Sequence, residues 1–276
     1  MAPVAHRSRI HLLAAKEAPV IAILQRKRSK LFHVVTIGTD EHWINDGSWF
    51  RGVIYAIDSD VSFDGKYMVY RAVGAGRGKY TKWSGVCRLP WLKTLVHVES
   101  PLTGGGYFDG PHDLKTHGWD WSEKVVSSDV PFVITRDSKR HFGNELAVIY
   151  ARFERDGFVR LGDNWDEEQE FRTPRFHVVC TGDDGWGRRP SPGHPELQVR
   201  YTGFANGAFQ FTFTLDQRAN LLEGANWATW DSGANLWIAR PGIVEQYNLD
   251  ALRSGRPSYT LDVDQFEPPL KSDKES

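Results

Sequence analysis

The stretch from Ser59 to Val98 holds four short β-rich segments separated by turns, and it constrains the fold more than any other part of the chain. The segments cover residues 60–63, 66–73, 83–88 and 94–98. The dipeptide Asp64-Gly65 joins the first two, and it is typical of a tight hairpin turn, because glycine accepts the positive φ that such turns need. Four antiparallel strands in about 40 residues is the size of one β-propeller blade. The pattern therefore predicts an all-β chain.

A looser copy of this pattern lies toward the C-terminus. Strands are predicted at 225–230, 235–239, 243–247 and 258–262. Asp231-Ser232-Gly233 stands where the first copy has Asp64-Gly65, although the second turn is one residue longer. The two copies together argue for a repeated structural unit.

The segment Val61–Tyr70, with sequence VSFDGKYMVY, resembles the blade motif of TolB-type β-propellers. The proline that is common before Asp-Gly in that motif is Phe63 here. The resemblance implies that the first strand of each blade lines a central channel and that the Asp-Gly turn leads outward. It implies a fold and no particular activity.

The spacing of the two copies sets the expected number of blades. At roughly 42 residues per blade, first strands near residues 60 and 226 fit a five-bladed β-propeller of four-stranded antiparallel blades, and at about 55 residues per blade they fit the four-bladed alternative. Further first strands expected at 106–108, 146–150 and 197–201 favour five. We expect the hairpin made by 20–24 and 31–37 to complete the last blade and close the ring. The domain is then 18–266, with an N-terminal extension at 1–17 that forms a helical turn or two and a polar tail at 267–276.

Charge and composition narrow the class of partner. Lys and Arg number 34 against 35 Asp and Glu, which gives a formal net charge of -1, so a nucleic-acid partner is not expected. The 11 Trp and 26 Gly, against 2 Met, favour strands joined by tight turns. No run approaches the roughly 20 apolar residues that span a bilayer, so no membrane association is expected.

The expected compartment is the cytoplasm. The apolar run at 10–15 is interrupted by Lys16 and Glu17, whereas a signal peptide needs an apolar core of roughly 7–15 residues. Cys87 and Cys180 are expected to be free thiols, and no cysteine–histidine cluster has the spacing of a zinc site.

Two groups of residues are candidates for a catalytic or a metal site. Some five-bladed propellers are glycoside hydrolases, which need two carboxylates about 5–9.5 Å apart. The candidate carboxylates are Asp60, Asp109, Asp113, Glu223 and Asp231. The residues His112, Asp113 and His117 share a long loop and suit a divalent metal ion, but the two histidines lack a standard ligand spacing. Turn chemistry explains the aspartates equally well, so we expect no catalytic residue, metal or cofactor, and we leave open whether Asp60, Asp109 and Asp113 form a site.

Aromatic and charged residues in the long loops point to a protein partner. Exposed loop tryptophans often serve as contact anchors, and arginines beside them add charge complementarity. The predicted partner-binding residues are Trp119, Trp121, Trp165, Trp186, Arg188 and Arg189. The sequence therefore favours an intracellular scaffold that docks a protein through loops on one face, rather than an enzyme. The alternative is a carbohydrate-binding or glycoside-hydrolase-like five-bladed propeller.

Overall fold

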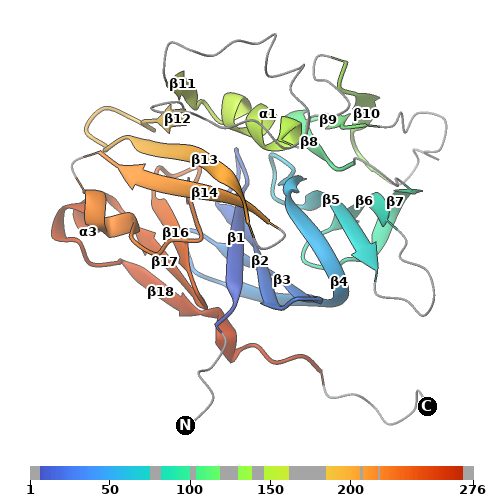
Figure 1. The fold of residues 1–276 in the computed structure, drawn as a ribbon, viewed down its shortest axis with the longest axis horizontal. Helices are drawn as coiled ribbons and strands as arrows, with labels where there is room; N and C mark the ends of the chain where they lie inside the picture. Colours follow the sequence, from blue (N-terminus) through green and yellow to red (C-terminus); the bar gives the residue numbers. More distant parts are fainter. Residues whose placement is uncertain are drawn as a thin grey trace.

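The computed structural model is all-β, with strands arranged in four open sheets and two short α-helices in the part of the chain that it describes (Figure 1). It describes residues 7–74, 82–99, 104–118, 130–138, 146–161, 185–205, 208–216 and 218–269. None of the helices within these ranges has the length and apolar character of a membrane-spanning segment.

The largest sheet has seven strands in chain order, from β1 to β7. Their bounds are β1 Arg9–Ala14, β2 Val20–Arg28, β3 Leu31–Gly38, β4 Ile44–Val61, β5 Tyr67–Gly74, β6 Lys82–Arg88 and β7 Thr94–Glu99. Strand β4 has 18 residues and belongs to two sheet halves, because its first part pairs with β3 and its second part with β5. The seven strands therefore form two antiparallel four-stranded halves, β1–β4 and β4–β7, that share one strand.

The other three sheets follow in chain order. A three-stranded sheet contains β8 Gly106–Gly110, β9 Asp113–Thr116 and β10 Val133–Arg136, in which β10 runs parallel to β9. An antiparallel sheet contains β11 Val159–Leu161, β12 Gly185–Arg188, β13 Leu197–Ala205 and β14 Ala208–Leu215. The last contains β15 Trp227–Trp230, β16 Leu236–Arg240, β17 Ile243–Tyr247 and β18 Tyr259–Asp262.

The two turns that the sequence aligns have similar hydrogen bonds. Asp64 accepts hydrogen bonds from the Ser62 hydroxyl at 2.6 Å and from the Lys66 backbone N–H at 3.1 Å. Asp231 accepts the Asn235 backbone N–H at 2.8 Å and the Trp237 indole N–H at 2.8 Å. Each aspartate thus fixes the turn that follows the first strand of a four-stranded unit. The predicted strands of both copies are confirmed, except that 60–63 is confirmed only in part: residues 60 and 61 end the 18-residue strand β4, and residues 62 and 63 belong to the turn.

Two predicted local structures are wrong. Residues 146–150, predicted as a strand, belong to the helix α1 Ala147–Arg155. Residues 10–17, predicted as helical turns in an extension, contain the strand β1, which pairs with β2. In both places the apolar run was too short to distinguish a strand from a helix, and packing decided the outcome. The short helix expected near 248–253 is confirmed as α3 Leu249–Ser254.

The half-sheet β1–β4 is buried on both faces. On one face, Ile10, Leu12, Ile21 and Ile23 join a core that includes α1 and strands of the last two sheets. On the other face, Leu13, Ala22, Leu24, Phe32 and Val34 pack into a second core with β4 and β5. The near-continuous apolar runs in β2 and β3 follow from this double burial.

Segments near the two ends of the described chain meet, but not as predicted. The hairpin β2–β3 pairs with β1 and β4, so it does not complete the last sheet. Strand β1 instead lies beside β15, between the last sheet and β4 (Figure 1). The Gln25 amide donates to the Val263 carbonyl at 2.9 Å, and the Ser8 hydroxyl donates to Asp264. The two ends are therefore joined by buried hydrogen bonds rather than by a shared sheet.

Candidate binding pocket

A pocket of about 500 Å³ opens where segments from distant parts of the chain meet. Its lining comes from β1, β2, β3, β4, β5, β6, the β13–β14 hairpin and the start of β15. Volumes of roughly 300–1,000 Å³ are typical of small-molecule sites. The pocket is therefore large enough for a small organic ligand.

A break in the register of β4 shapes one wall. The pairing with β5 shifts between Tyr55 and Asp60, and the Ser59 hydroxyl donates to the Tyr55 carbonyl at 2.8 Å. The intervening residues Ala56, Ile57 and Asp58 line the pocket. A β-bulge of this kind redirects side chains, as is common beside functional sites.

The residue just before β8 approaches this part of β4 closely. A Cβ atom at Gly105, where φ is +82°, would lie 1.9 Å from the Asp58 carbonyl oxygen. Glycine is therefore required at this position, both for its φ and for its lack of a side chain. The Asp58 carboxylate accepts from the Arg71 guanidinium at 2.9 Å, so this pocket carboxylate is already paired.

Two arginines face each other across neighbouring strands at the pocket. Arg9 of β1 is the direct register partner of Arg26 of β2, and Arg26 is in turn opposite Phe32 of β3. All three line the pocket. Burial lowers the pKa of Arg26, and the charge of Arg9 lowers it further. The like charges are thus close enough to repel.

Aromatic rings and two unpaired polar atoms form the remaining surface. The Trp227 ring packs against His11 at a tilt of 38°, with ring centroids 3.8 Å apart, and the Tyr55 ring lies 4.6 Å from the Arg71 guanidinium carbon. In the part of the chain that is described, the His11 Nε2 atom and the Asn226 Oδ1 atom are buried and have no hydrogen-bond partner. Burial, and then Arg152, hold the pKa of His11 well below its ordinary value, so its ring is neutral at neutral pH.

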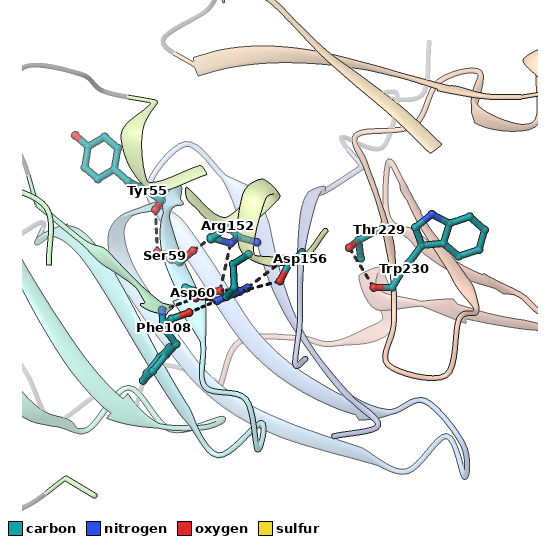
Figure 2. Close-up of polar contacts among 9 residues, drawn as sticks. Tyr55, Ser59, Asp60, Phe108, Arg152, Asp156, Thr229 and Trp230 are labelled. Atoms are coloured by element: carbon teal, nitrogen blue, oxygen red, sulfur yellow. Dashed lines mark hydrogen bonds and ion pairs between the residues drawn. The ribbon is translucent and has the colours of Figure 1, made fainter. Parts of the chain in front are cut away.

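A buried ionic cluster lies close to the pocket (Figure 2). Asp60 is 1% exposed and accepts the Phe108 backbone N–H at 2.8 Å. It is also paired with Arg155 and with Arg152, whose Nε atom lies 3.2 Å from Oδ1. Burial acts to lower the pKa of Arg155, but Asp156 and Asp60 outweigh it and raise the pKa. The cluster joins β4, β8 and α1.

Of the residues that were predicted to bind a partner, the structure describes Trp186, Arg188 and Arg189. Trp186 lies in β12 and is 2% exposed, packed against Tyr150 and Phe153, so the expectation of an exposed loop residue is wrong. Arg188 is half-buried, and Arg189 is exposed and pairs with Asp216 at 3.2 Å. The remaining predicted residues, Trp119, Trp121 and Trp165, lie outside the described residues.

The candidate carboxylates do not gather at one site as a free pair. Asp60 and Asp231 are buried in the hydrogen-bond networks given above. Asp109, Asp113 and Glu223 are exposed. His112 is exposed and His117 is buried, and no group of three potential ligands with metal-site geometry occurs among the described residues. Cys87 is buried and free, and burial raises the pKa of its thiol to about 12; Cys180 lies outside the described residues.

Sequence reasoning missed the pocket residues Arg9, His11 and Arg26. The signal was present as polar residues at alternate positions, Arg9 and His11, inside the apolar run of β1. Alternation of this kind marks one face of a strand. It was overlooked because the segment was not predicted to be a strand.

Comparison with known proteins gives little. No family model matches the chain, and no curated protein matches it. Among solved structures, the uncharacterized protein lmo1340 from Listeria monocytogenes EGD-e is similar at a TM-score of 0.33 and 10% identity, with 96% of each chain covered. The chain's function has to be argued from its own residues.

Proposed function

We propose that the chain is a ligand-binding module of the propeller type, built from five sheet units. Strand β4 divides the largest sheet into two units, and the three other sheets supply one each. The contacts of β1 with β15, of β1 with β4 and of β4 with β8 suit first strands that stand side by side around a centre. That the sheet units are blades of the TolB type, which the sequence resembles, is part of this proposal.

The observation that carries the proposal is the pocket itself. Four of the five units line it, and the β8–β10 sheet contributes none of its described lining residues, so a ligand held there touches segments from distant parts of the chain. The pocket also presents the unpaired buried atoms of His11 and Asn226. Buried polar atoms ordinarily have partners, and a bound ligand would supply them.

Binding is favoured over catalysis by the state of the carboxylates. A glycosidase acid must exchange a proton with its substrate. Asp60 is held by two arginines, and Asp58 by Arg71, so neither is free for that role. Docking of a protein through loops stays a prediction, as does a carbohydrate ligand. An intracellular, cytoplasmic location stays a prediction as well.

The test is a thermal-shift screen of a broad small-molecule library with the full chain. A ligand that binds only the folded state raises stability by about 2.7 kcal/mol at one hundred times its Kd. We expect stabilising compounds whose effect is lost in Ala56→Trp, which fills the pocket, and kept in Val159→Trp, which changes a residue 68% exposed and outside the pocket lining. No stabilising compound, or hits indifferent to Ala56→Trp, would overturn the proposal.

A further inference from the structure

The pocket carries an excess of positive charge. Its described lining residues include four cationic side chains, Arg9, Arg26, Arg71 and Lys82, and one carboxylate, Asp58. The Asp58–Arg71 pair cancels one cation. His11 adds no charge at neutral pH. Three cations therefore remain around one cavity.

These three cations lack carboxylate partners within the described chain. Neither Arg9, Arg26 nor Lys82 takes part in an ion pair there, and the polar contact of Arg26 is a long hydrogen bond of 3.4 Å to the Ser29 carbonyl. The buried arginines Arg152 and Arg155, by contrast, are both paired with Asp60. Like charges directly opposite on paired strands are destabilising, so Arg9 and Arg26 together work against the fold.

Aromatic residues around the arginines indicate which shape of ligand the pocket suits. Phe32 lies on the next strand beside Arg26, and its ring centroid is 6.0 Å from the guanidinium carbon. Further aromatic residues in the lining are Tyr55, Phe204, Phe209, Phe211 and Trp227. Phe204 is 57% exposed at the β13–β14 hairpin, so part of this apolar surface is open to solvent. Flat apolar groups stack well on such rings.

We infer that the pocket binds a small anionic ligand with a flat apolar body, and that Arg9 and Arg26 hold its carboxylate or phosphate group. The planar guanidinium presents a fork of donors that matches both oxyanions. Lys82 adds a point charge. The unpaired atoms of His11 and Asn226 meet polar groups elsewhere on the ligand. This inference rests on the proposed function and specifies the ligand for the same pocket.

Probes of similar shape that differ in charge test whether the pocket prefers an anionic ligand. Calorimetric titration of the full chain compares 2-naphthoate with 2-naphthamide, which has nearly the same shape and no charge, and with 2-naphthyl phosphate. We expect the better of the two anions to bind about tenfold or more tightly than the amide, because hydrogen bonds to charged groups are the stronger ones. Whichever anion binds more tightly identifies the oxyanion as carboxylate or phosphate. The affinity should also fall as salt rises.

Variants assign the preference to the two arginines. Arg26→Gln and Arg9→Gln should each reduce the preference for anion over amide to about twofold or less. Arg28→Gln, on the same strand but exposed and outside the pocket lining, should keep it. Arg26→Lys keeps the charge without the fork, and it should retain an intermediate preference, which serves as a second readout if a glutamine variant misfolds.

The outcomes separate the two proposals. Equal binding of naphthoate, naphthyl phosphate and naphthamide, lost in Ala56→Trp, would overturn the anion inference and leave the binding pocket intact. An anion preference that survives both arginine substitutions would overturn the assignment to Arg9 and Arg26. Failure of all three probes would overturn the inference as well, while the library screen still decides whether the pocket binds anything.

Discussion

Two pairs of arginines in the molecule differ in whether a carboxylate compensates their charge. Arg152 and Arg155 on α1 are buried against Asp60, which they share, and Asp156 adds a second carboxylate to Arg155. Arg9 and Arg26 are opposed across two strands at a pocket, and no carboxylate among the described residues compensates them. Both pairs bring like charges together, but only the first contains its own counter-ion.

The charges of the first pair stabilise the fold, whereas those of the second pair are only tolerated by it. A buried ion must be paired and hydrogen-bonded. The Asp60 cluster meets that condition through ion pairs and hydrogen bonds among groups from β4, β8 and α1. Arg9 is exposed and Arg26 is half-buried, so water at the pocket screens the repulsion between them. A cation pair that stabilises nothing in the folded chain is the feature expected of a site for an external anion.

The largest effect is expected from breaking the compensated cluster. Asp60→Ala leaves Arg152 and Arg155 buried without their shared counter-ion, so the free energy of unfolding should fall by about 3–5 kcal/mol. Chemical denaturation measures it. The control Asp109→Ala, at an exposed position in β8, should change the free energy by no more than about 0.5 kcal/mol. Similar losses in both variants would show that Asp60 is not the centre of a stabilising network.

A smaller effect is expected where a compensated arginine borders the pocket. Asp58→Asn removes the partner of Arg71, and the free energy of unfolding should fall by about 1–3 kcal/mol. It also removes the one carboxylate among the described lining residues, so the affinity for 2-naphthoate should rise severalfold. Asp216→Asn, which breaks the exposed pair with Arg189, is the control for stability. Weaker naphthoate binding in Asp58→Asn would contradict the comparison.

Acid should weaken the fold through the pocket histidine. Burial, and then Arg152, lower the pKa of His11 well below its ordinary value of 6.5. The unfolded chain therefore binds the proton first, and stability is lost as pH falls below about 6.5, by up to about 1.4 kcal/mol per pH unit.

The comparison that isolates His11 uses denaturation at pH 7.5 and pH 5.5. His11→Asn should lose less stability over this interval than the wild type, and His112→Asn, at an exposed position, should behave like the wild type. An unchanged pH dependence in His11→Asn would mean that the ring is protonated in the folded chain.

The smallest effect is expected at the uncompensated pair. Arg26→Gln removes a repulsion without removing an ion pair, so the free energy of unfolding should stay unchanged or rise by a few tenths of a kcal/mol. Arg155→Gln, the same substitution in the compensated cluster, should destabilise strongly by contrast. A loss of more than 1 kcal/mol in Arg26→Gln would assign Arg26 to structure rather than to binding.

The sequence predicts the two repeated regions well because their signals are local. Turns at Asp64 and Asp231, with alternating strands around them, depend on neighbours a few residues away. The helix α1 was mistaken for a strand because its identity depends on Leu146, Ile149 and Phe153 packing against strands far away in sequence. Strand β1 was missed for the same reason, since its pairing and burial are tertiary.

The candidate pocket could not be predicted for a related reason. Its residues come from segments that are up to about two hundred positions apart, and no motif connects Arg9, Asp58 and Asn226. The sequence directed attention to tryptophans instead. Trp186 is rich in contact area, but that same apolar surface is what places it in the core. Because the sequence does not show where each segment lies in the fold, residue type alone did not distinguish a tryptophan on the surface from one in the core.

The hydrogen bonds between the chain ends have a consequence for how the molecule folds. Ser8 and Asp264 are 256 positions apart, and Gln25 and Val263 are 238 apart. The entropic cost of closing a loop grows with its length, and contacts this distant slow folding. During synthesis β1 emerges well before its neighbour β15 and before Val263, which accepts the hydrogen bond from Gln25. Until then the N-terminal sheet keeps an apolar face uncovered, which makes the unfinished chain prone to aggregation.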